Sequence, residues 1–211
     1  MLTLSTYITT MMFVAKKHGY HHGDLRRAFL EEAVRVISRK GVDALTLRSV
    51  GERLGVSRTA MYRHFADKSA LLAAVAAEGF RMLRLQLLDA WERHGRSGDA
   101  FAEMGRAYVR FAVANPAHYR VMFGGRVEAH GDPDLAREGA GAFQVLVDAI
   151  IALQKNGTAR AENPLRFAQV IWATVHGVAM LAIDGLLERE QTDADTLVRF
   201  ANEQIRISMS V

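Results

Sequence analysis

Basic and hydroxyl side chains lie close together between positions 57 and 68, with the spacing of one face of a short helix. Arg58, Thr59 and Arg63 would project from that face, and guanidinium and hydroxyl groups of this kind hydrogen-bond to base edges in the major groove of DNA. Lys68 comes where a further helix would begin, and a cation beside a helix N-terminus suits a phosphate group. These residues therefore predict contacts to duplex DNA, with Arg58, Thr59 and Arg63 contacting the bases.

Two short helices joined by a tight turn would position these side chains. Thr46 can cap the first helix with its hydroxyl, and Gly55 stands where a left-handed residue would end it. Ser57 can cap the second helix in the same way. The inner face of the second helix would consist of apolar side chains, namely Ala60, Met61 and Phe65. The stretch from Thr46 to Lys68 thus predicts a helix-turn-helix.

The excess of positive charge is confined to the same region. The whole chain has a formal net charge of +4, yet residues 16–68 hold 12 Lys and Arg against 6 Asp and Glu, while the rest of the chain holds 15 against 17. A local basic surface suits binding to a phosphate backbone, although charge alone would equally fit a solvated face. A DNA-packaging protein without sequence preference would instead spread its basic charge over the whole chain.

Composition and motifs argue against several other classes of protein. The chain has 211 residues and no Cys, which excludes disulfides, thiolate metal sites and a cysteine nucleophile. It contains none of the spacings H-E-x-x-H, G-x-S-x-G or G-x-G-x-x-G. We therefore expect no enzyme activity, no cofactor and no metal. A basic and histidine-rich arm could enter a minor groove, stay in solvent or hold a metal, but it lacks preorganised support for a metal; it comprises Lys16, Lys17, His18, His21 and His22.

Two apolar stretches resemble membrane segments only in part. Residues 1–14 carry no charge, but threonines interrupt them and the lysines follow them, so we expect neither a signal peptide nor a spanning helix. Met11 or Met12 could also be the first residue of the protein. Residues 167–183 also lack charge, but polar side chains interrupt them, and we predict a helix buried on nearly all sides. A cytoplasmic protein without membrane contact is expected.

Helical periodicity and stop signals divide the chain into about nine helices, with no strand pattern. A long helix capped by Asp67 would run to about His94, and an apolar helix would run from Pro164 to about Glu188. Asp193 would cap the last helix, whose apolar set is Leu197, Phe200, Ala201, Gln204 and Ile205. We predict an all-α fold with a flexible N-terminal arm, a three-helix helix-turn-helix domain and a larger C-terminal helical bundle, over residues 1–19, 20–68 and 69–211.

The C-terminal half offers candidates for a small-molecule pocket. Trp172, His176 and Met180 recur every four residues and would share one face of a helix. An apolar concavity with a few polar groups suits a small ligand, although a packed core with an internally bonded His176 fits this spacing equally well. The candidate ligand contacts are Tyr108, Phe111, Tyr119, Met122, Phe143, Trp172, His176 and Met180.

The N-terminal pattern resembles the DNA-binding domain of TetR-type transcriptional regulators over about residues 20–75. The similarity is carried by Leu45-Thr46, Gly55-Val56-Ser57, Tyr62-Arg63-His64-Phe65, Lys68 and Leu71-Leu72. It implies a dimer that binds operator DNA, with an all-α C-terminal domain that binds a small ligand and mediates dimerisation. It also implies phosphate contacts by Tyr62 and His64, although Tyr62 could pack in the small core instead. The candidate DNA contacts are Thr46, Arg48, Ser57, Arg58, Thr59, Ala60, Tyr62, Arg63, His64 and Lys68.

Further motifs are similar to a TetR subgroup named for its Trp, His and Gly. They are Trp172-Ala173-Thr174-Val175-His176-Gly177, the stretch 119–124 and the stretch 20–26. We expect a repressor that pairs through its last two helices and leaves a palindromic operator when a small ligand tilts the fourth helix. An activating or ligand-independent DNA-binding regulator is the alternative. Gly51 replaces the alanine more common in the family, at a cost to the helix of about 0.5–1 kcal/mol.

Overall fold

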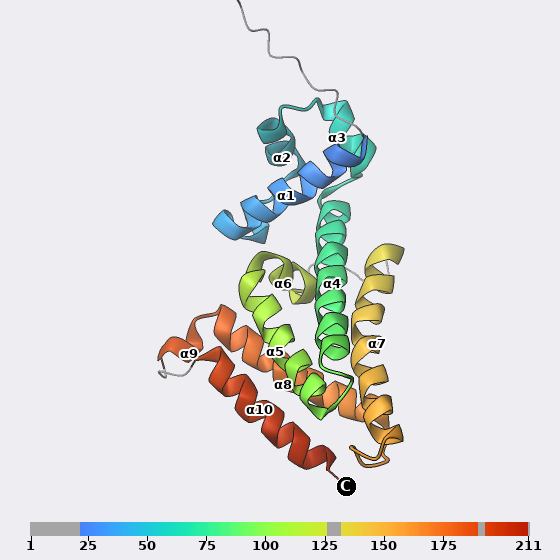
Figure 1. Cartoon of the computed structure of the whole chain (residues 1–211). Helices are drawn as coiled ribbons and strands as arrows, with labels where there is room; N and C mark the ends of the chain where they lie inside the picture. Colours follow the sequence, from blue (N-terminus) through green and yellow to red (C-terminus); the bar gives the residue numbers. More distant parts are fainter. Residues whose placement is uncertain (1–21, 126–131, 190–192, 211) are drawn as a thin grey trace, which may run out of the picture.

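The structure is a computed structural model that describes residues 22–125, 132–189 and 193–210, without the side chains of residues 22–24, 188 and 189. The predicted arm over residues 1–19 and the side chains of its basic and histidine cluster lie outside this description. Every regular element in the described residues is a helix (Figure 1), which confirms the all-α prediction. The elements are α1 (His22–Lys40), the 3-10 helix η1 (Val42–Ala44), α2 (Leu47–Leu54), α3 (Arg58–His64), α4 (Lys68–Arg93), α5 (Gly98–Ala114), α6 (Pro116–Phe123), α7 (Pro133–Lys155), α8 (Pro164–Ile183), α9 (Leu186–Arg189) and α10 (Ala194–Met209).

Helices α1–α3 form one end of the molecule, and α4 runs from that end into the bundle made by α5–α10 (Figure 1). Two clusters of buried apolar side chains follow this division. The N-terminal core joins α1–α3 to the first half of α4, and it includes Ala117 and Val121 from α6. The C-terminal core joins the second half of α4 to α5, α7, α8 and α10. Both α4 and α6 therefore contribute to both halves of the molecule.

The helix-turn-helix forms because its capping residues satisfy the free backbone groups at each helix end. The Thr46 hydroxyl accepts from the amide of Ser49 at 3.0 Å, and the Ser49 hydroxyl accepts from the amide of Thr46 at 3.3 Å. Gly55 ends α2 in the left-handed region with φ 65°, where glycine carries no steric penalty. Ser57 caps α3 by accepting from the amide of Ala60 at 3.2 Å. The three predicted boundary residues are confirmed.

Gly51 of α2 lies against the Met61 side chain of α3. A Cβ atom built at this position would lie 1.8 Å from the Sδ atom of Met61, so the Met61 side chain fills the space that any larger residue would need. Gly51 and Met61 are both buried. The glycine therefore does more than lower helix propensity, which was its only predicted effect.

Helix α8 is shorter and more exposed than predicted. It ends at Ile183 because the next turn contains Gly185 with φ 66°, and the remaining residues form the separate short helix α9. Its length and apolar composition would suit a membrane-spanning helix, a condition that core helices of other proteins also satisfy. Only 28% of its most apolar window is buried within the chain. The prediction of a helix buried on nearly all sides is therefore wrong for the single chain.

The inward face of α10 also differs from the predicted apolar set. Its buried side chains are Val198, Ala201, Ile205 and Met209, so the buried face is rotated from the predicted one. Phe200, which was placed in the predicted set, is 63% exposed, and Gln204 is exposed as well. Helices α8 and α10 thus both leave apolar side chains uncovered by the described chain.

Candidate nucleic-acid interface and C-terminal cavity

Helix α3 presents its polar side chains outward from a buried apolar base. Met61 and Phe65 are buried in the N-terminal core, whereas Arg58, Thr59 and Arg63 are exposed. This is the arrangement that entry of a helix into the major groove requires, because the anchored face holds the exposed face at a fixed height above the core. The three predicted base-reading residues share this exposed surface.

The remaining predicted residues of α3 differ in their exposure. Tyr62 is 50% exposed, and the Arg58 guanidinium lies 5.7 Å from the centre of its ring, so Tyr62 does not belong to the core. Ala60 and His64 are half-buried. The His64 ring lies 6.4 Å from the ring of Phe29, so His64 also contributes to packing against α1.

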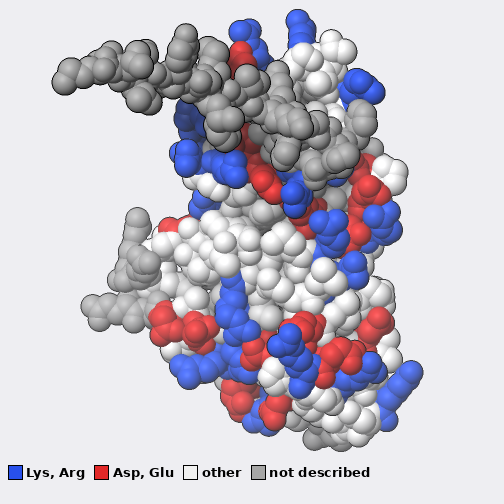
Figure 2. Space-filling model, turned by 45° about the horizontal axis from the view of Figure 1, so that its top comes forward, with Lys and Arg blue, Asp and Glu red and all other residues white. Residues whose placement is uncertain are grey.

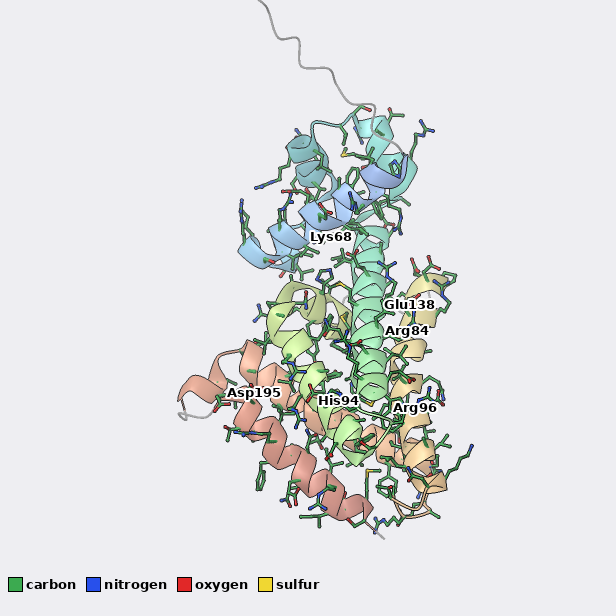
Figure 3. The ribbon with its side chains drawn as sticks, viewed as in Figure 1. Lys68, Arg84, His94, Arg96, Glu138 and Asp195 are labelled. Carbon is green, nitrogen blue, oxygen red and sulfur yellow. The ribbon has the colours of Figure 1, made fainter. Side chains whose placement is uncertain are left out.

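Two predicted contact residues use their hydroxyl groups as helix caps, namely Thr46 and Ser57. Arg48 is exposed on α2, and its Nε donates to Glu52 at 2.7 Å. Lys68 lies at the start of α4 (Figure 3), and its Nζ donates to the backbone carbonyl of Asp43 at 3.3 Å. This bond ties η1 to the N-terminus of α4, and no local pattern of residues predicts it.

A buried carboxylate fixes α1 against α2. Glu32 is only 6% exposed, and it accepts from Arg35 on its own helix at 2.9 Å and from Arg53 on α2 at 3.2 Å. A buried charge is tolerated when it is paired and hydrogen-bonded in this way. Figure 2 shows further Lys and Arg atoms projecting around the end of the molecule that carries α1–α3. Sequence reasoning did not single out Glu32.

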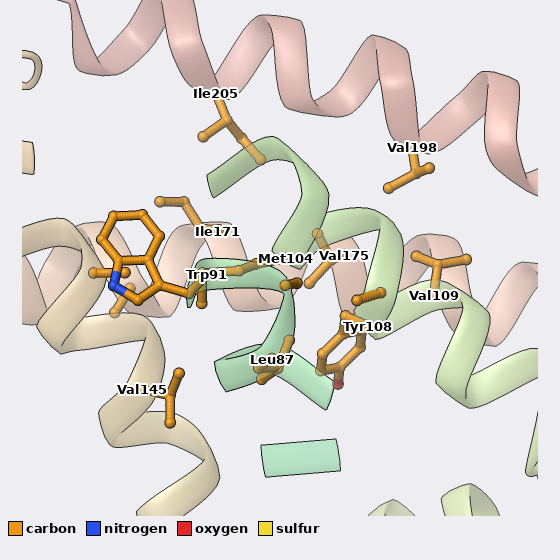
Figure 4. Packing of buried hydrophobic residues seen from close by; sticks show 14 of the residues in the cluster. Leu87, Trp91, Met104, Tyr108, Val109, Val145, Ile171, Val175, Val198 and Ile205 are labelled. Atoms are coloured by element: carbon orange, nitrogen blue, oxygen red, sulfur yellow. The ribbon is translucent and has the colours of Figure 1, made fainter. Parts of the chain in front are cut away.

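The C-terminal core borders a cavity of about 430 Å³ that is partly open to solvent, since Gln169 and Trp172 in its lining are exposed. Figure 4 shows part of its surroundings, with Leu87, Met104, Tyr108 and Val175 facing one another from α4, α5 and α8. The lining residues are Phe80, Leu83, Leu87, Phe101, Met104, Gly105, Tyr108, Phe123, Gly139, Ala142, Phe143, Leu146, Gln169, Ile171, Trp172, Val175 and Asn202.

Three of the eight predicted ligand contacts line this cavity, namely Tyr108, Phe143 and Trp172. Phe111 and Tyr119 are buried in the C-terminal core beyond the lining. Met122 lies beside Gly79 of α4, where a Cβ atom would lie 2.5 Å from its Sδ. His176 and Met180 are half-buried and do not line the cavity. The lining residues from α4 and α10 were not among the predicted contacts.

A chain of hydrogen bonds borders the cavity. The indole Nε1 of Trp172 donates to the Tyr108 hydroxyl at 3.1 Å, the hydroxyls of Tyr108 and Tyr119 lie 3.0 Å apart, and the Tyr119 hydroxyl lies 2.6 Å from Nδ1 of His176. Burial lowers the pKa of His176 and raises the pKa of Tyr108 to about 12, because both charged forms would be poorly solvated. All four side chains are therefore uncharged at neutral pH.

Helix α6 lies between this cavity and the N-terminal core. Phe123 at its end lines the cavity, and Tyr119 belongs to the hydrogen-bond chain. On α6, Nε2 of His118 lies 3.4 Å from the Glu78 carboxylate of α4, and this contact holds the pKa of Glu78 below its ordinary value. A displacement of Phe123 would therefore be transmitted through α6 to α4.

Helix α3 is anchored by its apolar face and exposes its polar face, and it belongs to a helix-turn-helix next to a helical bundle. These features define a DNA-binding protein of the helix-turn-helix class. Residues 29–75 match the family model "Bacterial regulatory proteins, tetR family", and residues 101–205 match "Tetracyclin repressor-like, C-terminal domain". The chain belongs to the TetR family of transcriptional regulators. It is a DNA-binding regulator and not an enzyme, as predicted.

Individual relatives agree with this assignment. The uncharacterized HTH-type transcriptional regulator YobS of Bacillus subtilis is 24% identical over 181 residues, which cover 83% of this chain and 87% of that protein. The regulator Rv0681 of Mycobacterium tuberculosis is 25% identical over 183 residues, with 83% and 79% covered.

Solved structures show the same fold. A protein of unknown function from Rhodococcus sp. RHA1 is 32% identical, with a TM-score of 0.83 over 92% of this chain and 100% of that chain. The TetR-family regulator PfmR of Thermus thermophilus is 18% identical, with a TM-score of 0.67 over 84% and 96%. At this level of identity, the similarity to PfmR shows a common fold only.

Proposed function

We propose that the chain is a cytoplasmic repressor that binds a palindromic operator as a homodimer and is released by a small ligand in the C-terminal cavity. The observation that carries the DNA-binding part is the surface of α3, where Arg58, Thr59 and Arg63 are exposed above a buried apolar base. These three side chains contact base edges. Tyr62 and Lys68 contact phosphates and set the register of α3 on the duplex.

Pairing of two copies is supported by an apolar face that the described chain leaves uncovered. The face has helical spacing and comprises exposed Val170, Ala173 and Leu181 and half-buried Gly177 on α8, with Phe200 and Ile207 and one polar residue, Gln204, on α10. Val170 is 65% exposed. A Cβ atom at Gly177 would have no neighbour within 4 Å, so a helix of a second copy has room to approach closely. A four-helix interface formed by α8 and α10 of both copies would cover this face.

A second copy fits this face better than lipid does. On α10 the apolar side chains alternate with charged Arg199, Glu203 and Arg206, all exposed, and these would have to be desolvated in a bilayer. At a protein interface the same charges form the polar rim around the apolar centre. The family relationship to soluble DNA-binding regulators supports the same choice.

Control by a ligand is supported by the position of α6. A molecule in the cavity touches Phe123 at the end of α6, while Ala117 and Val121 of the same helix belong to the N-terminal core. Movement of α6 would tilt α4 and change the separation of the two α3 helices in the dimer. Because half-sites recur at about 34–36 Å per turn of DNA, a dimer with the wrong separation loses half of its contacts.

Selection of bound duplexes from a random DNA pool at fixed salt concentration tests the DNA-binding part. We expect enrichment of a palindrome whose half-sites are separated by about one turn of DNA or a multiple of it. Enrichment of single half-sites would contradict the dimer, and a pool that stays random after selection would contradict sequence-specific binding.

A further inference from the structure

The C-terminal cavity offers a ligand no opposite charge. Among the described residues that line it, none is Asp, Glu, Lys, Arg or His. The polar side chains in the lining are those of Tyr108, Gln169, Trp172 and Asn202, all of them neutral, and most of the others are aliphatic or aromatic. An ion placed here would lose its hydration without gaining a counter-charge, whereas an uncharged apolar molecule would gain from burial.

A neighbouring hollow does not supply the missing charge. This hollow of about 270 Å³ shares Phe101 and Asn202 with the cavity as common walls, and it is lined by charged residues that include Arg106 and Arg206. Both arginines are already paired with a glutamate three residues earlier on their own helices. The Asn202 amide is held in place because its Nδ2 donates to the carbonyl of Ala102 at 2.8 Å.

The distances in the hydrogen-bond chain beside the cavity indicate which group donates and which accepts in each bond. The distance of 2.6 Å between the Tyr119 hydroxyl and Nδ1 of His176 fits an O–H donor better than an N–H donor, whose bonds are about 2.9–3.0 Å long. If Tyr119 donates to His176, its oxygen accepts from the Tyr108 hydroxyl, and Tyr108 accepts from Trp172. The Tyr108 hydroxyl also lies 3.3 Å from Nδ1 of His176, a nitrogen that only accepts in this arrangement. The proton of Tyr108 is therefore used by Tyr119 and His176, and one lone pair of its oxygen remains.

We propose that the cavity takes an uncharged, largely apolar molecule whose one polar group donates a hydrogen bond to the Tyr108 oxygen, such as an aliphatic alcohol. This ligand class rests on the proposed function, since it describes the effector of the same site. At roughly 30 Å³ for a group the size of water, the cavity of about 430 Å³ holds a molecule on the order of 15 non-hydrogen atoms. A linear alcohol of medium chain length fits this volume.

Four probes with chains of similar length separate the chemistry from the size of the ligand. They are decanol, methyl octyl ketone, decanoate and decylammonium, and each is titrated into the full-length protein by calorimetry at neutral pH. We expect decanol to bind most tightly, with the two ions more than about tenfold weaker because of their desolvation. Tighter binding of decanoate than of decanol, or no binding of any probe, would overturn the proposal.

Two substitutions test the position and the hydrogen bond. Ala142→Leu, at a buried position in the lining, fills the cavity and should abolish decanol binding, whereas Ala140→Leu, at an exposed position on the same helix, should leave it unchanged. Tyr108→Phe should weaken decanol by about fivefold and leave the ketone unchanged, because the ketone cannot donate. Equal losses for both probes would mean that Tyr108 only maintains the cavity.

The binding titration is independent of DNA. If decanol binds as described but operator DNA is retained, the ligand class stands and the proposed release mechanism fails. If operator binding is specific but the cavity prefers an ion, the proposed regulator stands and this ligand class fails.

Discussion

The Met61 side chain of α3 fills the space beside Gly51 of α2, so substitutions at these two positions should interact. A Cβ atom at Gly51 would fall 1.8 Å from Met61 Sδ, and overpacking of this kind costs about 1–3 kcal/mol. The higher helix propensity of alanine would offset about 1 kcal/mol of this cost. We therefore expect Gly51→Ala to lower the free energy of unfolding by about 1 kcal/mol, as measured by urea denaturation.

The effect of Gly51→Ala on the free energy of unfolding should change from a decrease to an increase once Met61 is shortened. In a Met61→Ala background, Gly51→Ala should stabilise the protein by about 0.5–1 kcal/mol, and the double-mutant cycle should give a clear coupling energy. Equal effects in the two backgrounds would show that Met61 moves aside without cost.

Arg58 and Lys68 should affect DNA binding in different ways. Arg58 is exposed on α3, so Arg58→Ala should reduce discrimination at one base position by about 1–3 kcal/mol while the fold and the dimer persist. Lys68 is at the start of α4, where Lys68→Ala should weaken binding to all sequences alike and make its salt dependence shallower. Arg93→Ala, at an exposed position at the far end of α4, is the control and should change neither property. Fluorescence anisotropy with operator and unrelated duplexes measures both effects, and unchanged discrimination by Arg58→Ala would contradict its role.

His176 should make stability depend on pH. Its pKa lies below the ordinary value of 6.5 because the ring is partly buried, so above that pH the ring is neutral in both the folded and the unfolded state. As the pH falls below 6.5, the unfolded chain binds a proton that the folded chain does not, and stability decreases. The decrease between about pH 7 and pH 5 should be smaller in His176→Gln than in the wild type.

His94→Gln is the matched control for this pH dependence, because His94 is exposed near the end of α4. Urea denaturation at several pH values measures both variants. A pH dependence that is unchanged in His176→Gln would mean that other groups cause it.

At the scale of whole helices, the uncovered face of α8 should decide the oligomeric state. Val170 on α8 is 65% exposed, and an aspartate buried in the dimer interface at this position would be an unpaired charge. Val170→Asp should therefore dissociate the dimer without unfolding the chain. Val113→Asp on α5, where Val113 is 51% exposed, should leave it intact. Sedimentation velocity at several concentrations distinguishes the two results, and equal behaviour of both variants would contradict pairing through α8.

Sequence alone predicts helix boundaries well where the signal is local. Thr46, Ser57 and Asp67 cap the helices that follow them, because a cap depends on residues three positions away. The boundary between α8 and α9 was missed although Gly185 marked it, since the apolar run continues on both sides. The exposure of Phe200 could not be predicted, because amphipathic spacing does not distinguish a face covered by the same chain from one left for a second copy.

At the scale of the whole molecule, periodicity predicted only a small part of the cavity. Phe80, Met104 and Asn202 line it from α4, α5 and α10. Nothing in the sequence of any one of these helices distinguishes them from residues that pack in an ordinary core. A void arises from how the side chains of several helices fail to fill the space between them, which depends on packing rather than on local sequence. The four-residue recurrence of Trp172 and His176 identified one residue of the lining and one of the hydrogen-bond chain behind it.

If α6 links the cavity to α4, ligand and DNA must oppose one another by equal amounts. A coupling free energy of about 1–3 kcal/mol corresponds to about a 5- to 150-fold change in affinity. We expect saturating decanol to weaken operator binding within this range, and saturating operator DNA to weaken decanol binding by the same factor. Anisotropy with decanol and calorimetry with operator DNA measure the two halves. Ala142→Leu, which fills the cavity, should abolish both effects while keeping operator affinity, and a decanol effect that persists in this variant would place the coupling outside the cavity.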